Sequence, residues 1–329
     1  MSANVLVIGS NSFSGASFIK FLLEKDYYVF GCSRSHEKEC FFLPYKWTNN
    51  KNFTFFQYDI NKDTNKILEL IKSEKIEYIV NFAAQSMVGE SWEYPNHWFQ
   101  TNAVAISSLV SSLAKLEFIK KYVHITTPEV YGNCAGFISE DFPFNPSTPY
   151  ASSRVASDLI VKNYHEAFNF PFIATRAANV FGPGQQLYRI IPKSIISILT
   201  GKKIPLHGGG VSTRSFIHID DVSNATEKLM LSKSVGETYH ISTNDIISIK
   251  DLITKIAEIL NTDFNLVVDL IPERVGKDST YELSSQKIRN DFNWSEKISL
   301  HDGIISTIDW VKNYLPELKK TDFEYIHKK

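Results

Sequence analysis

The chain has 329 residues, of which 43% are hydrophobic and 22% charged, a composition typical of a globular protein with a sizeable core. Its formal net charge of −1 gives no reason to expect nucleic acid or an anionic membrane as a partner. Cys32, Cys40 and Cys134 are scattered, so we expect reduced thiols in a cytoplasmic protein and neither a disulfide framework nor a metal site. We also expect no membrane span and no cleavable leader, because no apolar run approaches the ~18 residues that cross a bilayer.

Short apolar runs alternate with longer amphipathic stretches through the first half of the chain. Strands are predicted over 5–8, 28–31, 53–58, 78–82, 121–126 and 172–176, and helices over 15–24, 64–73, 102–116 and 150–168. This alternation predicts an α/β fold with a doubly wound, Rossmann-type parallel sheet. The carboxyl ends of such strands meet at one edge, where ligands bind.

The regular alternation weakens after residue 176. Loops are predicted over 179–186 and 207–212, and helices over 249–260 and 301–314. We therefore expect a dinucleotide-binding domain over residues 1–178, rejoined by part of 215–245. A smaller mixed domain over 179–329 is expected to bind the substrate.

The first predicted strand runs into the turn Gly-Ser-Asn-Ser-Phe-Ser-Gly at residues 9–15. Gly9 permits a tight turn and Gly15 allows close helix packing, so free N–H groups at the helix start can hold a pyrophosphate. Ser12 stands where the usual spacing has glycine, and an ordinary glycine turn is the alternative. The turn residues expected to contact a cofactor are Gly9, Asn11, Ser12, Phe13, Ser14 and Gly15.

The second strand ends in Ser33-Arg34-Ser35, without the acidic residue that bonds the ribose in NAD sites. The guanidinium of Arg34 suits a 2′-phosphate, so we expect NAD(P) with a slight preference for NADP. A solvated Arg34 is the alternative. The other residues expected along the dinucleotide follow the third and fourth strands: Asp59, Ile60, Ala83, Ala84 and Gln85.

Tyr150 and Arg154 are four residues apart and share one face of a predicted helix. A nearby cation favours the phenolate of a tyrosine, whose unperturbed pKa is about 10. A phenolate beside a nicotinamide can take the proton of a sugar hydroxyl while hydride leaves the same carbon. Taken alone, a tyrosine and an arginine at this spacing would be interpreted as a surface pair on a helix. Because they follow a predicted cofactor site in the sequence, we interpret them as catalytic.

Several segments resemble the sugar-nucleotide epimerase/dehydratase family of extended short-chain dehydrogenases/reductases. They are NFAAQSMVGESWEYP at 81–95, TTPEVYG at 126–132, NPSTPYASSR at 145–154, RAANVFGPGQ at 176–185 and RSFIHIDDV at 214–222. The similarity runs from Gly9 to about Trp310 and is strongest to nucleoside-diphosphate-hexose 4,6-dehydratases.

This resemblance implies a sequence of three steps on a nucleotide sugar. The C4 hydroxyl is oxidised by the cofactor, with Tyr150 as base and Thr127 bonding the same oxygen. Glu129 then removes the C5 proton. Water leaves across C5 and C6, and hydride returns to C6, which gives a 4-keto-6-deoxyhexose.

Glu129 separates the possible activities, because 4-epimerases similar to this chain usually have a small residue there. The alternatives are a nucleotide-sugar 4-epimerase, a C4 oxidoreductase and a catalytically lapsed cofactor-binding protein. Pro128 replaces the aspartic acid with which many dehydratases protonate the departing C6 hydroxyl, and Arg154 replaces the family's lysine. Together with Ser12, these departures would be the signs of a lapsed enzyme.

The resemblance also implies contacts to the nucleotide sugar in the second half of the chain. Arginines that converge on a diphosphate make strong bidentate bonds. The expected substrate residues are Ser86, Asn179, Arg189, Arg214 and Arg274. A homodimer is implied as well, in which helices 102–116 and 150–168 pair across a two-fold axis.

Overall fold

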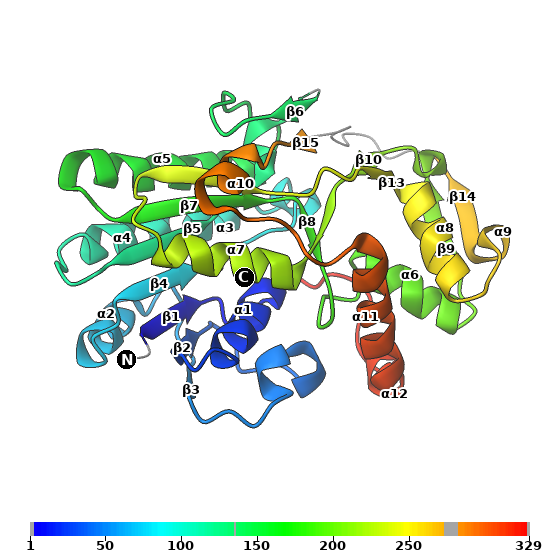
Figure 1. Ribbon diagram of the computed structural model, residues 1–329, viewed down its shortest axis with the longest axis horizontal. Helices are drawn as coiled ribbons and strands as arrows, with labels where there is room; N and C mark the ends of the chain where they lie inside the picture. The colour runs from blue at the N-terminus through cyan, green and yellow to red at the C-terminus, as the bar shows by residue number, and fades with distance from the viewer. Residues whose placement is uncertain (1–2, 135, 273–281, 328–329) are drawn as a thin grey trace.

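Seven parallel strands form the central sheet of the computed structural model, which describes residues 3–134, 136–272 and 282–327 (Figure 1). In spatial order the strands are β12 (Glu237–Ile241), β7 (Phe172–Ala177), β5 (Lys121–Ile125), β4 (Tyr78–Asn81), β1 (Asn4–Ile8), β2 (Tyr28–Cys32) and β3 (Phe53–Phe56). The six strands predicted in the first half all belong to this sheet, with ends shifted by no more than two residues. The predicted fold class is therefore confirmed.

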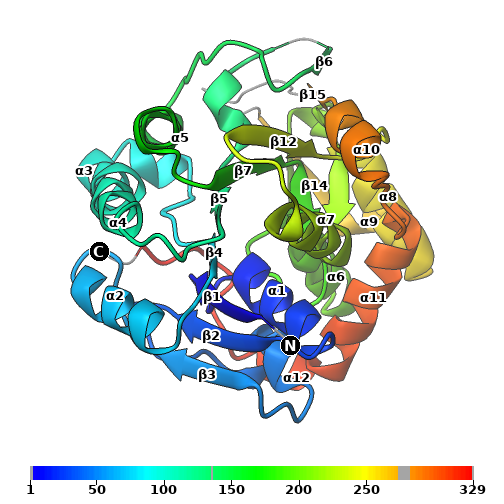
Figure 2. The same cartoon turned by 60° about the vertical axis from the view of Figure 1, so that its left-hand side comes forward.

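Both faces of the sheet are buried, as in other parallel sheets. Val5 and Val7 of β1 face one apolar cluster, whereas Leu6 and Ile8 face another. The first cluster lies under α1 (Phe13–Leu23) and α7 (Ile219–Leu231). The second lies under α2 (Thr64–Ser73), α4 (Ala105–Leu113) and α5 (Pro149–Phe168), so helices cover both faces (Figure 2).

Helix α5 begins and ends where its sequence dictates. The Thr148 hydroxyl accepts the Ala151 N–H at 3.1 Å, and Pro149 occupies the first helical turn, where its missing N–H costs nothing. Asn169 ends the helix in the left-handed region, at φ 55°. This start places Tyr150 at the sheet edge and Arg154 one turn further along.

The predicted helix over 102–116 begins earlier than its sequence pattern indicates. Helix α3 (Pro95–Phe99), a π-helical turn over Gln100–Val104 and α4 follow one another without a break. A π turn inserts one extra residue into the helix, and such turns occur often at functional sites. Asn102 lies in this turn and is fully buried.

A second lobe packs its own apolar cluster, which includes Phe181, Ile195, Ile256 and Ile308. Its helices are α6 (Ile190–Leu199), α8 (Ile249–Ile259), α9 (Phe264–Val267), α11 (Leu300–Asn313) and α12 (Leu315–Leu318). Its strand pairs are β8 (Asn179–Phe181) with β11 (Phe216–His218), β9 (Ile204–His207) with β14 (Val268–Ile271), and β10 (Thr213–Arg214) with β13 (Ile247–Ser248). The loops predicted over 179–186 and 207–212 are therefore partly wrong, since β8 opens the first and a 3₁₀ turn at Gly208–Gly210 fills the second.

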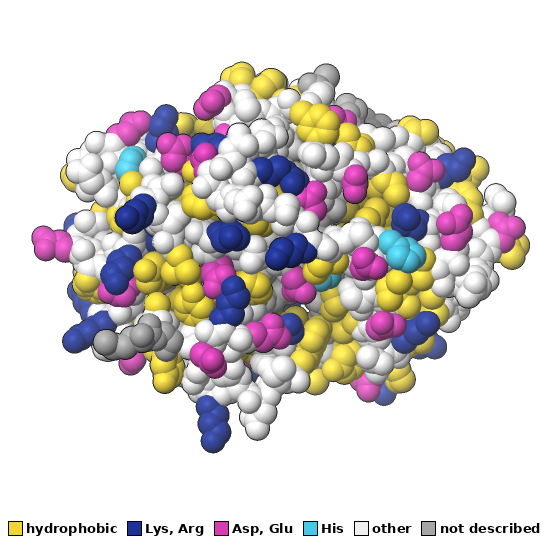
Figure 3. Space-filling view, in the orientation of Figure 1, with side chains coloured by type: hydrophobic (Ala, Val, Ile, Leu, Met, Phe, Trp, Pro, Cys, Tyr) yellow, Lys and Arg dark blue, Asp and Glu magenta, His cyan; other side chains and the backbone are white. Residues whose placement is uncertain are grey.

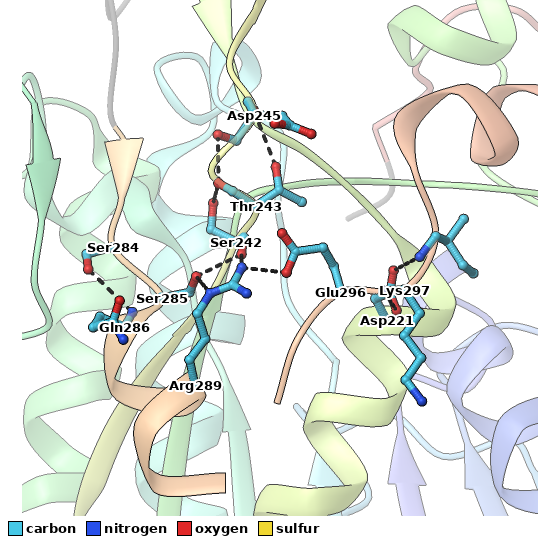
Figure 4. Close-up of polar contacts among 12 residues, drawn as sticks. Asp221, Ser242, Thr243, Asp245, Ser284, Ser285, Gln286, Arg289, Glu296 and Lys297 are labelled. Carbon is cyan, nitrogen blue, oxygen red and sulfur yellow. Dashed lines mark hydrogen bonds and ion pairs between the residues drawn. The ribbon is translucent and has the colours of Figure 1, made fainter. Parts of the chain in front are cut away.

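After the second lobe begins, the chain returns to the sheet through α7, β12 and α10 (Gln286–Phe292). A remaining pair, β6 (Phe137–Ile138) with β15 (Glu282–Leu283), lies near this return. Polar contacts of Arg289, in α10, hold the returning chain in place (Figure 4). Arg289 donates to the Ser285 hydroxyl and the Ser242 carbonyl, and it pairs with Glu296. Because α7, β12 and α10 lie after residue 178 but belong to the sheet side, the two lobes do not divide cleanly at that residue. The domain boundaries 1–178 and 179–329 stay a prediction.

Asp221 of α7 also holds the returning chain in place. Its two carboxylate oxygens accept the N–H groups of Lys297 and Ile298 at 2.9 and 3.0 Å. The second aspartate of the RSFIHIDDV segment thus joins α7 to the chain that leads into α11.

The outer surface in Figure 3 intersperses basic and acidic side chains over the face that is drawn. In the described ranges, no helix combines the length and apolar character that a bilayer crossing requires.

Candidate active site

A cleft of about 300 Å³ opens at the carboxyl edge of the sheet, where the loops after β1, β2, β3 and β4 meet. We call it the edge cleft. Its lining contains the predicted cofactor residues Gly9, Asn11, Ser12, Ser33, Arg34, Ser35, Asp59, Ile60, Ala83, Ala84 and Gln85. The structure therefore brings together side chains from loops that are far apart in the sequence.

Gly9 and Gly15 are required by close approach of the backbone. Gly9 has φ 85°, and a Cβ there would lie 2.7 Å from the Ala83 nitrogen. A Cβ at Gly15 would lie 2.4 Å from the Gly9 carbonyl oxygen. Only glycine fits both positions, so the turn can hold the helix start of α1 against the ends of β1 and β4.

Ser12 replaces the expected glycine without strain, because its φ is −76°. Its hydroxyl accepts the Gly15 N–H at 3.1 Å and donates to the Gly9 carbonyl at 2.7 Å. Ser12 is therefore the N-cap of α1, and the Gly15 N–H is used inside the protein. Within the described residues, the N–H groups of Phe13 and Ser14 make no hydrogen bond, and they remain as donors for an anion.

Asn11 fixes the loop that carries Arg34. Its side-chain amide donates to the carbonyl oxygens of Ser35 and His36, both at 2.9 Å, and its N–H donates to the Ser33 hydroxyl. Arg34 and Lys38 line the same end of the edge cleft. This end therefore carries cations that a phosphate or a ribose-bound anion could contact.

Asn102, which no predicted site included, fixes the loop after β4. Its side chain accepts the Gln85 N–H at 2.8 Å, donates to the Gln85 carbonyl at 2.9 Å, and donates to Ser153 of α5 at 3.0 Å. One buried amide thus joins the cofactor loop to the helix of Tyr150. An asparagine inside an otherwise apolar helix pattern was the available signal.

A larger cavity of about 610 Å³, the inner cavity, adjoins the edge cleft and lies between the sheet and the second lobe. Ser12, Ala84 and Ser86 line both. The inner cavity is also lined by the predicted residues Phe13, Ser14, Thr127, Glu129, Tyr150, Arg154, Asn179, Arg189 and Arg214. Arg274 lies outside the described residues.

A short turn presents Thr127 and Glu129 to the inner cavity. Thr127 is extended at the end of β5, and Pro128 opens a 3₁₀ turn that runs to Tyr131. Gly132 closes the turn at φ 64°, where a Cβ would lie 2.1 Å from the Asn145 carbonyl oxygen. Proline and glycine at the two ends therefore fix the direction of the intervening Glu129.

The pKa of Tyr150 lies above the ordinary value of a tyrosine, although the sequence predicts a nearby cation that favours the phenolate. Burial and the neighbouring Glu129 carboxylate raise the pKa of the phenol to about 12, against the lowering effects of Arg154 and of the hydrogen bond with Thr127. Arg154 lowers the pKa of Tyr150, as predicted, but desolvation of the phenolate raises it by more. Without a further positive charge nearby, Tyr150 is therefore a neutral phenol at pH 7.

Arg154 is nearly completely buried and donates from Nη2 to the carbonyl of Ile125, the last residue of β5. This bond holds the guanidinium beside the loop that begins at Thr126. The charge that replaces the family's lysine is therefore still directed into the region of Tyr150.

Three of the expected substrate residues enter the inner cavity from the second lobe, and Ser86 enters it from the loop after β4. Asn179 begins β8, and its amide donates to the Ser215 carbonyl at 3.1 Å. Arg189 is the N-cap of α6 and lies over the Tyr188 ring at 5.4 Å. Arg214 lies in β10 and donates to the Thr213 carbonyl at 2.7 Å. Two cations thus reach one cavity from different elements.

One turn of α5 beyond Arg154, a buried charged cluster connects the helix to the sheet. Asp158 pairs with Arg176 of β7 at 2.7 Å and lies 3.2 Å from His124 of β5. Burial alone would raise the pKa of Asp158, but His124 and the Arg176 charge lower it to about 2. The ionised Asp158 carboxylate and the Arg176 cation thus form a buried ion pair that joins α5 to β7.

The edge cleft fits a dinucleotide on the evidence of its own backbone. Gly9 lets the turn lie directly against the backbone of Ala83, and in the described ranges the Phe13 and Ser14 N–H groups at the start of α1 remain as donors. Ala83 and Ala84, in the loop after β4, have small side chains that take up little of the edge cleft. Together these features are those of a Rossmann-type dinucleotide-binding fold with a second, larger cavity next to the dinucleotide site.

Comparison with known proteins agrees with this description. Residues 6–307 match the family model described as GDP-mannose 4,6 dehydratase. The human dTDP-D-glucose 4,6-dehydratase is 31% identical over 284 residues, covering 84% of this chain and 79% of the human protein. The chain therefore belongs to the sugar-nucleotide epimerase and dehydratase family of extended short-chain dehydrogenases/reductases, as predicted.

Solved structures show the same fold. A dTDP-glucose 4,6-dehydratase from Streptomyces venezuelae with NAD bound superposes with a TM-score of 0.88 at 26% identity, covering 95% of this chain and 98% of that one. A UDP-glucuronic acid 4-epimerase from Bacillus cereus, in complex with UDP-glucuronic acid and NAD, gives 0.85 at 25% identity, covering 94% and 99%. Both relatives hold NAD, so the preference for NADP has no support among them.

Proposed function

We propose that this chain is an NAD(P)-dependent nucleotide-sugar 4,6-dehydratase. The observation that carries the proposal is the shared lining of the inner cavity by Thr127, Glu129 and Tyr150. An enzyme that only oxidises and reduces C4 needs one base, whereas dehydration also needs a group that removes the C5 proton. Glu129 is a second base in the same cavity.

Each of the three residues has a role that its chemistry allows. Thr127 donates a hydrogen bond toward the oxygen at C4, and Tyr150 accepts the proton of that hydroxyl. Glu129 takes the proton from C5, which the neighbouring ketone makes acidic. Pro128 cannot donate a proton, so the protonated Glu129 is the group that can deliver one to the departing C6 hydroxyl, which leaves as water. When hydride returns to C6, C5 takes a proton that comes from solvent.

A dinucleotide in the edge cleft would supply the hydride acceptor, and later the donor, for this chemistry. Gly9, Phe13 and Ser14 would hold its pyrophosphate, and the 33–35 loop its adenosine end. NAD is the cofactor that the relatives favour. The second-lobe cations Arg189 and Arg214 would hold the diphosphate of a nucleotide sugar.

Product analysis tests the proposal against its alternative, a nucleotide-sugar 4-epimerase or C4 oxidoreductase. The protein is incubated with NAD⁺ and UDP-, GDP-, dTDP- or CDP-hexoses, and products are analysed by mass spectrometry for their formula and by proton NMR for the configuration at C4. A product lighter by one water supports the dehydratase. A product of unchanged formula with inverted C4 identifies the epimerase, and net reduction of NAD⁺ identifies the oxidoreductase. No conversion of any sugar, despite dinucleotide binding, identifies a lapsed enzyme.

A homodimer is also part of the proposal. The second copy would cover the helices α3, α4 and α5, where Phe99, Val104 and Leu159 are exposed. Sedimentation analysis of the purified chain checks this expectation by its mass in solution.

A further inference from the structure

A segment that follows α12 forms part of the edge cleft. Residues 323–327, which we call the strap segment, run from α12 toward α3 (Figure 2). Tyr325 and Ile326 line the same cleft as Gly9, Arg34 and Asp59. The wall of the cleft is therefore built partly from a stretch more than 300 residues away in sequence from its glycine turn.

The first half of the strap segment is held by the second lobe. Phe323 belongs to the margin of that lobe's apolar cluster, and the Lys202 ammonium lies 5.5 Å from its ring. The Tyr325 ring meets Tyr188 edge-on, with centroids 5.7 Å apart. Tyr188 lines both the edge cleft and the inner cavity, so Tyr325 packs on a residue of the site itself.

The other end is held by the sheet side of the molecule. The His327 ring stacks at 5.0 Å from Tyr94, 5.1 Å from His97 and 5.0 Å from Trp98, which lie in or just before α3. Its Nε2 lies 2.8 Å from Nδ1 of His97. The Tyr325 hydroxyl lies 3.3 Å from Nδ1 of His327, so the two side chains support each other.

Resting on the proposed dinucleotide site, we propose that the strap segment retains the bound dinucleotide, with Tyr325 and Ile326 as its contacts and His327 as the anchor. The segment joins the two lobes and contributes to the cleft between its attachments. A ligand in the edge cleft is therefore released only when the strap moves. An edge-on aromatic contact at Tyr325 and stacked rings at His327 stabilise the segment in this position.

Retention suits the proposed chemistry. A dehydratase returns its cofactor to the starting oxidation state in every cycle, so the cofactor has no need to leave. A C4 oxidoreductase that released reduced cofactor would have to open the strap once in each turnover. A segment that retains the cofactor therefore suits a dehydratase, whereas it would slow the turnover of an oxidoreductase that must release its cofactor in every cycle.

The test measures release of NAD⁺ and NADP⁺ from the full chain by rapid dilution with displacement, together with equilibrium Kd values. We expect Tyr325→Ala with Ile326→Ala to speed dissociation at least tenfold, and His327→Ala to do the same from outside the cleft. Glu324→Gln is the matched control, because Glu324 lies in the same segment, is 83% exposed and only pairs with Lys193 at 3.5 Å. Melting temperatures verify that every variant is folded.

The outcomes separate this inference from the proposed function. If the unaltered chain binds neither dinucleotide, the proposed function fails. If it binds one, and the folded strap variants release it at the unaltered rate, the strap proposal alone is overturned. Equal acceleration by Glu324→Gln would also overturn it, because the effect would then come from general loosening of the segment.

Discussion

Tyr150 shows how a single residue depends on its surroundings for its chemistry. Burial raises the pKa of its phenol to about 12, and Glu129 adds to this effect. Arg154 and the Thr127 hydrogen bond lower the pKa but do not outweigh burial. A phenol of this kind becomes an effective base only when further positive charge enters the cavity. Under the proposed function, the positively charged ring of an oxidised nicotinamide cofactor would supply that charge, and cofactor loading would then activate Tyr150.

Replacing Tyr150 with phenylalanine should lower kcat by a factor of about 10² to 10⁴, because the proton of the C4 hydroxyl loses its acceptor. Dinucleotide Kd should change little, since the ring remains. Steady-state assays and equilibrium binding provide the two values. Unchanged turnover would show that Tyr150 is not the base.

At the scale of elements, the turn between β5 and β6 determines where Glu129 lies. Gly132→Ala should destabilise the fold by at least about 1–2 kcal/mol from backbone strain, with a further cost from the contact at Asn145. Gly136→Ala is the matched control, because Gly136 also has positive φ, at 73°, but an added Cβ meets nothing within 4 Å. Urea unfolding of both variants gives the comparison. Equal losses would mean that the contact at Asn145 contributes nothing.

The attachment of α5 to the sheet predicts a pH dependence of stability. Asp158 has a folded pKa of about 2 against an ordinary value of 3.8, so its stabilisation is complete above that ordinary value. It is lost as pH falls through the folded pKa, and the full effect is about 2 kcal/mol. Unfolding free energies of the unaltered chain and Asp158→Asn should therefore differ most above pH 4 and converge toward pH 2. A difference that is independent of pH in this range would contradict the assignment.

The elements differ in how well their sequence predicts them. The strands of the central sheet are apolar on both faces and bounded by turn residues, so their positions follow from the pattern alone. The three-residue β8 lies inside a Gly- and Pro-rich stretch, and only its pairing with β11 makes it a strand. The loop predicted there reflected composition, which carries no information on distant partners.

The same distinction holds for the site. Gly9, Thr127, Glu129 and Tyr150 belong to local motifs, so the sequence predicts them and the structure places them along two adjoining spaces. Asn102 and Tyr325 belong to no such motif, because their contacts depend on tertiary packing. The pKa of Tyr150 could not be predicted either, since burial is the main contribution to it.

At the scale of the whole molecule, the inner cavity is formed by both lobes. Thr127 and Tyr150 come from the sheet side, and Arg189 and Arg214 from the second lobe. A ligand that contacts both sides binds the folded chain and not the unfolded one, and so raises the free energy of unfolding.

The cognate nucleotide sugar should therefore raise Tm by several degrees, because saturation at 100 times Kd adds about 2.7 kcal/mol. Thermal-shift measurements with UDP-, GDP-, dTDP- and CDP-glucose should show one nucleotide above the others. The free hexose is the control and should leave Tm unchanged. Equal shifts for all four would show that the base is not recognised.

The central claim is that Glu129 and Tyr150 act on one hexose, and solvent-deuterium incorporation tests it most directly. In D₂O the unaltered chain should place deuterium at C5 of a 4-keto-6-deoxy product, because the C5 proton is lost to Glu129 and C5 takes a solvent-derived deuteron when hydride returns to C6. Glu129→Gln should form no such product, while NAD⁺ binding stays the same. A product with deuterium at C5 from Glu129→Gln, or one from the unaltered chain without it, would contradict the account.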